Sequence, residues 1–121
     1  MKMKNKKGFT LIELIVVITI IAVLTVAGVI SFGGASKRAR DSRRMADLEK
    51  IRIGLELYRQ GMGVSYPATL NVLVPTYLQA VPVGPRGVAI GDTYSYSHSG
   101  YTYTLRTTLE ETGIGYSVTN P

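Results

Sequence analysis

The residue with the clearest chemical consequence is Glu13, the one acid in an apolar segment near the N-terminus. It follows a lysine-rich start and precedes residues 14–30, which carry no charged side chain. A charged residue costs roughly 2.5 to 3.5 kcal/mol at the centre of a membrane helix even on lenient insertion scales, so such a residue usually has a partner and a task. The chemistry expected of Glu13 is therefore ion pairing in a low-dielectric environment.

Other chemistry has little support in the sequence. The chain has no cysteine, which excludes disulfides, thiolate metal sites and thiol nucleophiles. Its one histidine, His98, is predicted at the tip of a turn, with no serine or acid placed to make it catalytic. No nucleophile–base pair, phosphate-binding glycine loop or metal-ligand spacing is found. The sequence therefore predicts no catalytic residue, cofactor or metal site, and an enzyme is not expected.

Glu13 also belongs to a motif. The stretch GFTLIELI begins at Gly8 and follows a leader with four lysines. It resembles the class III signal of type IV prepilins and type II secretion pseudopilins. The resemblance implies that a membrane peptidase cuts after Gly8, that the new amino group of Phe9 is methylated, and that the apolar segment is kept. It also implies that Glu13 meets the Phe9 amine of an adjacent subunit and sets the register of a filament.

The same resemblance implies a set of partners. These are other copies of the chain, the prepilin peptidase and methyltransferase, an inner-membrane assembly platform, an assembly ATPase that acts indirectly, and membrane lipid. The protein would be a single-pass protein of the cytoplasmic membrane, oriented with its leader in the cytoplasm, and then part of an extracellular or periplasmic filament. The sequence leaves open whether that filament is a type IV pilus or a type II secretion pseudopilus, and whether the subunit is major or minor.

Other interpretations of the N-terminus remain. An ordinary secretory signal peptide also has a basic start and an apolar stretch, and cleavage would then fall among residues 33–36. Against this, the apolar run from Leu14 to Ile30 is longer than the ~7 to 15 residues usual in such a signal, and a glutamate at its head is unusual. A signal anchor without assembly, a secreted binding protein and a DNA-capturing minor pilin are the alternative functions.

The charge of the chain is mostly a property of its leader. The formal net charge is +6, but cleavage after Gly8 leaves 10 basic against 8 acidic side chains. A second basic cluster runs from Lys37 to Arg44, and Lys37, Arg40 and Arg44 share one helical face. Because acids lie among and just after these residues, nucleic-acid binding is not expected, whereas contact with lipid before assembly is.

One long helix is expected to carry these residues. Residues 9–30 would span about 33 Å at ~1.5 Å per residue, enough for a hydrocarbon layer of ~30 Å, in which a single segment has to be helical. No proline occurs between Ser36 and Pro67, and three i to i+4 charge pairs indicate that the helix continues to about Gln60. The pairs are Lys37 with Asp41, Arg43 with Asp47, and Arg52 with Glu56. An apolar stripe should face a packed domain; it comprises Ala46, Leu48, Ile51, Ile53, Leu55, Leu57, Tyr58 and Met62.

Three glycines interrupt this helix near the end of its apolar segment. Gly28, Gly33 and Gly34 each weaken a helix interior by about 1 kcal/mol relative to alanine. The helix is expected to bend or melt there, as helices of the resembling family do when subunits pack into a fibre. Close packing of small residues is an equally good interpretation.

A long loop should follow the helix. Prolines punctuate residues 62–92, and one short helical turn is expected over residues 69–74. The stretches YPAT from Tyr66 and LVPTYL from Leu73 look like the loop between helix and sheet in the major, G-type pseudopilins, which bind calcium through nearby acids. Here residues 84–87 read GPRG, and Asp92 is the one acid between Glu56 and Glu110. Since calcium takes about six to eight oxygens, that site is not carried over, and binding near Asp92 by backbone oxygens stays open.

A small sheet is predicted at the C-terminal end. Residues 94–97 and 101–105 alternate at period two around residues 98–100, which predicts a hairpin with tyrosines toward the helix and Thr, Ser and Arg106 outward. Two registers are open, with residue 96 opposite 101 or 103, and both place tyrosine opposite tyrosine. Residues 115–119 are predicted as a third strand.

The fold class is α+β and pilin-like, with a long N-terminal transmembrane and assembly helix packed on an antiparallel sheet of about three strands. The expected segments are a leader at 1–8, the apolar helix at 9–35, its amphipathic half at 36–61, a loop at 62–92 and the sheet at 93–121.

Overall fold

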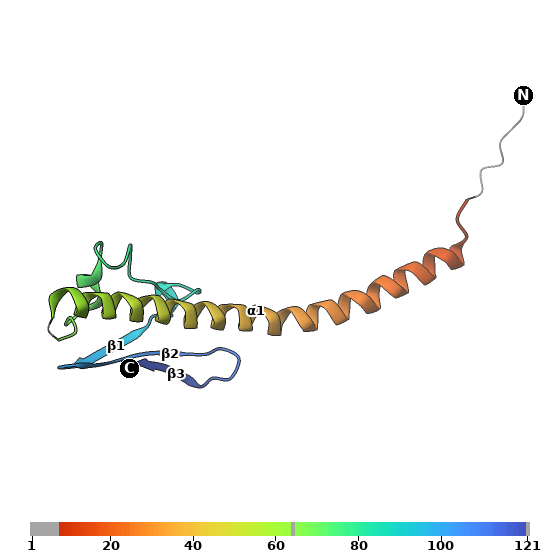
Figure 1. Cartoon of the computed structure of the whole chain (residues 1–121). Helices are drawn as coiled ribbons and strands as arrows, with labels where there is room; N and C mark the ends of the chain where they lie inside the picture. Colours follow the sequence, from red (N-terminus) through yellow and green to blue (C-terminus); the bar gives the residue numbers. More distant parts are fainter. Residues whose placement is uncertain (1–7, 64, 121) are drawn as a thin grey trace, which may run out of the picture. The chain divides into compact units, whose positions relative to one another are not determined.

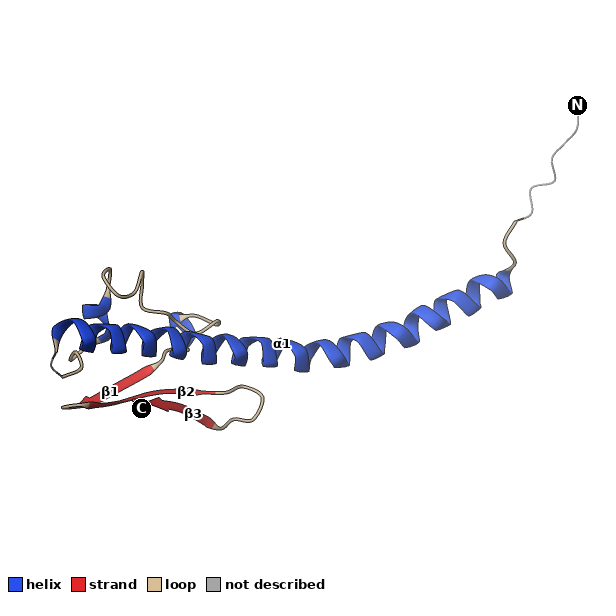
Figure 2. Cartoon of the chain, viewed as in Figure 1, coloured by secondary structure: helices blue, strands red, loops and turns tan. Residues whose placement is uncertain are grey.

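The computed structural model describes residues 8–63 and 65–120 and contains one long helix and one small sheet (Figures 1 and 2). Most of the predicted leader, residues 1–8, therefore lies outside the described residues. The elements in chain order are helix α1 (Leu11–Met62), the 3-10 turns η1 (Leu70–Leu73) and η2 (Val88–Ile90), and strands β1 (Ser95–Ser99), β2 (Thr102–Thr108) and β3 (Gly115–Thr119). This arrangement confirms the expected α+β fold class. The chain divides between Ala35 and Ser36 into two compact units, called here the N-terminal unit and the head.

The N-terminal unit is helical from Leu11 onward, and its apolar side chains have no partner within the described chain. Ile30, for example, is 75% exposed. By length and composition this part of α1 is able to cross a membrane. Its two threonine hydroxyls donate to carbonyls of the preceding turn, Thr19 to Val16 at 2.8 Å and Thr25 to Ile21 at 2.7 Å. These polar groups are therefore satisfied inside the helix, as an apolar environment requires.

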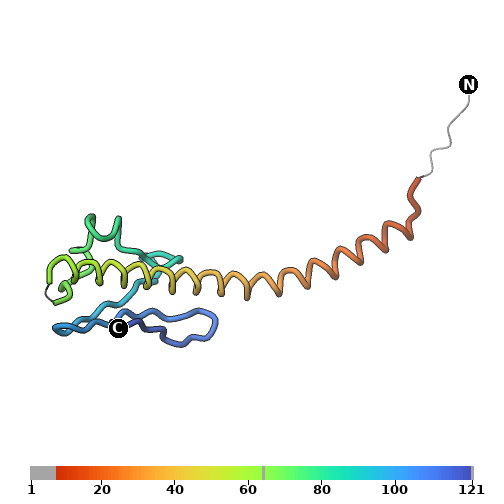
Figure 3. The backbone as a smooth tube through the Cα atoms, viewed as in Figure 1, coloured from red at the N-terminus to blue at the C-terminus, as the bar shows by residue number. Residues whose placement is uncertain are grey.

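The head is built around a narrow apolar stripe on α1. Leu48, Ile51 and Leu55 are fully buried, and they pack against four residues of the loop and sheet. Those four are Tyr66, Leu73, Tyr103 and Leu105. The loop between α1 and β1 and the three-stranded sheet both pack on the helix in the head, as the backbone tube also shows (Figure 3).

The predicted width of this stripe is wrong. Ile53 and Leu57 are 52% and 45% exposed, Met62 is 58% exposed, and Ala46 is exposed as well. Successive residues of a helix turn by about 100°, so positions 46, 53 and 57 project away from the buried positions 48, 51 and 55. The head covers one side of α1 and leaves the opposite side open.

The sheet has the order β1-β2-β3 with antiparallel pairing, and β3 coincides with the predicted third strand. Both predicted hairpin registers are wrong, because Tyr96 pairs with Leu105 and Tyr103 pairs with His98. The turn consists of Gly100 and Tyr101, with Gly100 at φ 57°, so glycine supplies the left-handed conformation that a tight hairpin turn needs.

The correct register keeps the predicted faces of the sheet. It differs from the predicted pairing of residues 96 and 103 by two residues, and a shift by two leaves every side chain on the same face. Tyr103, Leu105 and Thr107 are buried toward the helix, whereas Thr104, Arg106 and Thr108 point to the other face. Tyr101 is an exception to the predicted aromatic face, because it lies in the turn and is 70% exposed. His98 lies within β1 rather than at the turn tip, with its ring stacked on Tyr96 at 5.9 Å between centroids.

Candidate processing and assembly site

The bond between Gly8 and Phe9 lies just before the first residue of α1. Residues 8–10 have no regular secondary structure, and Phe9 is 94% exposed. A peptide bond inside a helix is tied into the backbone ladder, whereas one in an exposed terminal segment is open to a protease. The predicted processing residues, Gly8 and Phe9, therefore lie in an accessible conformation within the described chain.

Glu13 folds back onto the start of the helix. Its Oε2 atom accepts hydrogen bonds from the backbone N–H of Thr10 at 2.7 Å and from the Thr10 hydroxyl at 2.8 Å. The Glu13 N–H donates in turn to the Thr10 hydroxyl at 3.3 Å. This reciprocal arrangement is a capping box, in which two otherwise unpaired N–H groups of the first turn are satisfied.

The capping box engages only one of the two oxygens of the Glu13 carboxylate within the described chain. Its Oε2 is engaged with Thr10, while Oε1 accepts no hydrogen bond from the described part of the chain. Glu13 therefore caps its own helix with one oxygen and can bind a cation with the other. Thr10 was not predicted from sequence, although threonine three residues before glutamate at the start of an apolar run is the signature of this cap.

The three glycines expected to give flexibility lie inside regular helix. Gly28, Gly33 and Gly34 all fall within α1, and a methyl group built at Gly28 or Gly33 would have nothing within 4 Å. No contact in the described chain thus requires glycine at these two positions. Bending or close packing at the glycines during assembly stays a prediction.

The head holds a second group of charges, centred on Arg44. The Arg44 side chain is only 2% exposed and lies among three carboxylates. It donates to Asp41 at 2.8 Å, to both oxygens of Asp92 at 3.1 and 2.7 Å, and to Glu110. We call Asp41, Arg44, Asp92 and Glu110 the buried charge cluster. It joins α1 to the loop before β1 and to the loop between β2 and β3.

Backbone groups reinforce this cluster. Asp41 accepts the N–H groups of Glu110 at 2.8 Å and Glu111 at 2.9 Å, so one helix carboxylate fixes two successive residues of the β2–β3 loop. Arg40, the residue before Asp41 in the helix, donates to Glu110 at 2.8 Å. An arginine and its carboxylates tolerate burial only when their remaining hydrogen-bonding groups are satisfied, as they are here.

The charges shift one another's protonation equilibria. Hydrogen bonds from Arg40 and Arg44 lower the pKa of Glu110 to about 2. The hydrogen bond from Arg44 likewise lowers the pKa of Asp92. Burial alone would raise the pKa of Asp41, but the two backbone N–H groups and Arg44 outweigh it, and the net pKa is lowered. All three carboxylates are therefore ionised at neutral pH.

This cluster corrects two expectations from sequence. The predicted i to i+4 pairs are absent from the described residues, where Asp41 pairs with Arg44, Asp47 with Lys50 and Arg52 with Glu49 at i to i+3 instead. A basic residue placed before an acid at i to i+4 is the weaker orientation, and tertiary partners compete for the same acids. Arg40 and Arg44 are also engaged inside the head, so the predicted basic face for lipid is not a single free surface.

The cluster also bears on Asp92. Both oxygens of this carboxylate face the Arg44 guanidinium, and Oδ2 accepts the N–H of Arg86 at 3.0 Å as well. Within residues 8–63 and 65–120 no group of three or more metal-ligating side chains is arranged around a common point. The positive charge beside Asp92 is thus supplied by the chain's own arginine.

The comparisons with known proteins concern the first part of the chain. No curated protein and no solved structure gives a significant match. Residues 3–29 match the family model described as the prokaryotic N-terminal methylation motif. This stretch includes Gly8, Phe9, Thr10 and Glu13, and therefore the predicted cleavage position, the capping box and most of the apolar helix. Together with the single apolar N-terminal helix and the small antiparallel sheet, the motif supports a type IV pilin-like or pseudopilin precursor.

Proposed function

We propose that this protein is a structural subunit of a helical filament of the type IV pilus or type II secretion pseudopilus kind. The precursor is held in the membrane by the N-terminal unit, is cut between Gly8 and Phe9, and receives a methyl group on the Phe9 amine. Mature subunits then leave the membrane and bundle their apolar helices in the filament core. Contacts between a surface and a different surface of the next copy do not close, so they generate fibres.

The observation that carries this proposal is the geometry at the start of α1. Thr10 holds one oxygen of Glu13 at 2.7 and 2.8 Å and leaves the other oxygen without a partner in the described chain. An unpaired carboxylate is costly in apolar surroundings, and a cationic amine is the partner that reduces this cost. The Phe9 amine of a neighbouring subunit, cationic with or without the methyl group, supplies that partner and fixes the axial register.

Analysis of the mature N-terminus tests the processing step. Protein purified from membranes is expected to begin at Phe9 and to carry one methyl group on its amine, as measured by mass spectrometry of the N-terminal peptide. A mature chain beginning near Ser36 would instead indicate a freely secreted protein and would overturn the proposal.

Substitution of Glu13 tests the assembly step. Glu13→Ala is expected to be cleaved and inserted normally but to form much less filament, measured by shearing and sedimentation. Thr25→Ala is the matched control, because the Thr25 hydroxyl bonds only to its own helix at Ile21. Normal filament yield from Glu13→Ala would show that the carboxylate does not set the register.

The neighbouring genes would distinguish the two kinds of filament. A neighbouring retraction ATPase would favour a pilus, whereas an outer-membrane secretin with secretion partners would favour a pseudopilus.

A further inference from the structure

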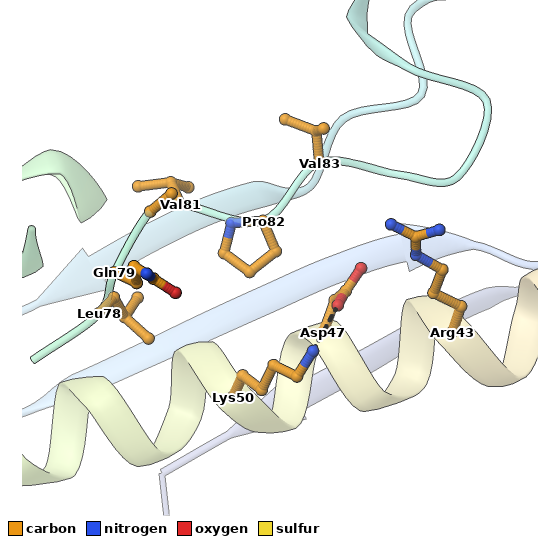
Figure 4. A pocket seen from close by; sticks show the side chains of 9 residues that line it. Arg43, Asp47, Lys50, Leu78, Gln79, Val81, Pro82 and Val83 are labelled. Atoms are coloured by element: carbon orange, nitrogen blue, oxygen red, sulfur yellow. Dashed lines mark hydrogen bonds and ion pairs between the residues drawn. The ribbon is translucent and has the colours of Figure 1, made fainter.

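An open cleft lies on one flank of α1 in the head. It has a volume of about 550 Å³ and lies between the helix and the extended segment of residues 78–83 (Figure 4). Arg43, Asp47 and Lys50 line it from the helix. The opposite wall is mostly apolar; it includes Leu78, Ala80, Val81, Pro82 and Val83. In Figure 4 the Pro82 ring points from the segment toward the helix.

One of the charged residues that line the cleft has no partner of opposite charge in the described chain. Asp47 is buried, accepts the Tyr94 hydroxyl at 2.9 Å and pairs with Lys50 at 3.4 Å. Arg43 has no carboxylate within ion-pair distance in residues 8–63 and 65–120. The cleft therefore combines an apolar wall with one uncompensated cation, and it suits a ligand that is apolar with an acid beside it.

The β2–β3 loop, residues 109–114, has this composition. Ile114 is 65% exposed, and nothing in the described chain covers it. The Glu111 side chain is 47% exposed, and its ion pair with Arg38 at 3.4 Å lies at the surface, where Arg38 is 65% exposed. The loop is held in shape by backbone hydrogen bonds from Leu109 to Ile114 at 3.0 Å and from Gly113 to Leu109 at 3.0 Å. Its base is fixed to α1 by Asp41. A preordered loop loses little conformational entropy when it binds.

The loop and the cleft are formed by different residues of the head. Four helix residues contact the loop, namely Arg38, Arg40, Asp41 and Arg44, whereas Arg43, Asp47 and Lys50 line the cleft. The exposed loop residues Glu111 and Ile114 are not among the residues that line the cleft. A loop that binds a different surface on the next copy can join successive copies, and such an interface does not close on itself.

We infer that the β2–β3 loop of one copy inserts into the cleft of a second copy. Ile114 packs on the apolar wall formed by residues 81–83, and Glu111 lies opposite Arg43. This inference rests on the proposed function and adds to it a contact between heads, in addition to the contact between apolar helices.

Disulfide cross-linking tests the contact directly, because the natural chain has no cysteine. The double variant Ile114→Cys with Val83→Cys is assembled into filaments and oxidised. Both replaced side chains are exposed, at 65% and 45%, so folding should be unaffected. A ladder of covalent oligomers is expected on a non-reducing gel, whereas filaments mixed from the two single variants should give dimers and no larger species.

Tyr101→Cys with Val83→Cys is the matched control. Tyr101 is 70% exposed but lies in the turn before β2, at the other end of that strand from the β2–β3 loop. Filaments that form normally but give no ladder with the Ile114 pair, or an equal ladder with the Tyr101 pair, would overturn the inference and leave the filament proposal standing. If the natural protein forms no filaments at all, the proposed function itself is wrong and the inference falls with it.

A charge-reversal experiment tests the proposed ion pair between Glu111 of one copy and Arg43 of the next. Arg43→Glu should lower filament yield about tenfold, because two acids then face each other across the contact. Adding Glu111→Lys to that variant should restore most of the yield. Failure of the second substitution to restore it, with both variants folded by circular dichroism, would contradict the pairing of Glu111 with Arg43.

Discussion

At the scale of the residue, Arg44 makes more ion pairs than any other side chain in residues 8–63 and 65–120. It is 2% exposed and forms ion pairs with Asp41, Asp92 and Glu110, which come from three separate segments. Removing one partner of a buried ion pair leaves an uncompensated charge and costs about 3 to 5 kcal/mol. Arg44→Met, which keeps an unbranched apolar stem but removes the guanidinium, is therefore expected to lower the free energy of unfolding by about this amount, measured by urea denaturation of the full chain in detergent.

Arg43→Met is the control for this substitution. It changes the neighbouring arginine, which has no ion pair in the described residues, and should alter stability by less than about 0.5 kcal/mol. Equal losses for the two variants would mean that charge near this part of the helix matters and that the specific contacts of Arg44 do not.

Gly84 lies against Asp92 of the same cluster, where there is no room for a side chain. Its N–H donates to the Asp92 carbonyl at 2.9 Å, and a methyl group at Gly84 would overlap the Asp92 carboxylate. Gly84→Ala should therefore displace Asp92 from Arg44 and destabilise the head by about 1 to 3 kcal/mol, as overpacking commonly does. The measurement is the thermal unfolding midpoint of the variant.

Gly115→Ala makes the matched comparison for Gly84, since a methyl group there has nothing within 4 Å and the backbone is not in the left-handed region. Its midpoint should stay close to that of the natural protein. A similar fall at both glycines would remove the steric argument for Gly84.

At the scale of the element, the attachment of the β2–β3 loop to α1 should depend on pH. The ordinary pKa of Glu110 is 4.5, and its partners lower it to about 2 in the folded chain. A carboxyl whose pKa is lowered by folding stabilises the protein above its unfolded pKa, and this contribution is lost as the pH falls toward the folded pKa. Asp41 and Asp92 act in the same direction. Stability in urea should therefore be maintained near neutral pH and fall between about pH 4.5 and pH 2.

Glu110→Gln isolates one part of this dependence. The variant should be less stable than the natural protein at pH 7, and the difference should shrink toward pH 2, where the natural Glu110 also becomes neutral. A difference of constant size from pH 7 to pH 2 would show that ionisation of Glu110 contributes nothing.

The elements with local signals were predictable from sequence, and those set by distant contacts were not. The apolar run, the alternation in β2 and the third strand each depend on a periodic pattern within one segment. The hairpin register was wrong because it depends on which residues form the turn, and Gly100 with Tyr101 was not recognised as the turn. At the N-terminus, Gly8, Phe9 and Glu13 were predicted as processing and assembly residues from their motif, whereas Thr10 was missed as the structural partner of Glu13.

The buried charge cluster shows the limit of sequence patterns most clearly. Arg44 meets Asp92 and Glu110, 48 and 66 positions further along the chain, and no local spacing reports such contacts. Helical spacing alone paired Asp41 with Lys37, whereas the folded chain pairs it with Arg44 and with the β2–β3 loop. An acid that tertiary structure turns inward cannot be assigned by counting along its own helix.

At the scale of the whole molecule, the exposed apolar helix and the buried core lie in different parts of the chain. All the residues that are buried in the described chain lie beyond Ala35, in the head. The N-terminal unit leaves its apolar side chains exposed, and in water exposed apolar surface favours association. In the proposed function its partner is lipid or another copy of the same helix, while the head carries its own core.

This division predicts that the head folds alone and stays monomeric. A fragment of residues 36–121 keeps the buried core and the buried charge cluster. It should unfold cooperatively, with about 0.05 to 0.15 kcal/mol of stability per residue. Light scattering should give the mass of one copy, because a single loop-and-cleft contact is too small to hold two heads together, whereas the mature chain should require detergent or form polymer. An unfolded fragment would show that the N-terminal unit is needed for the core, and a fragment that polymerised like the mature chain would show that the apolar helix is not the main source of association.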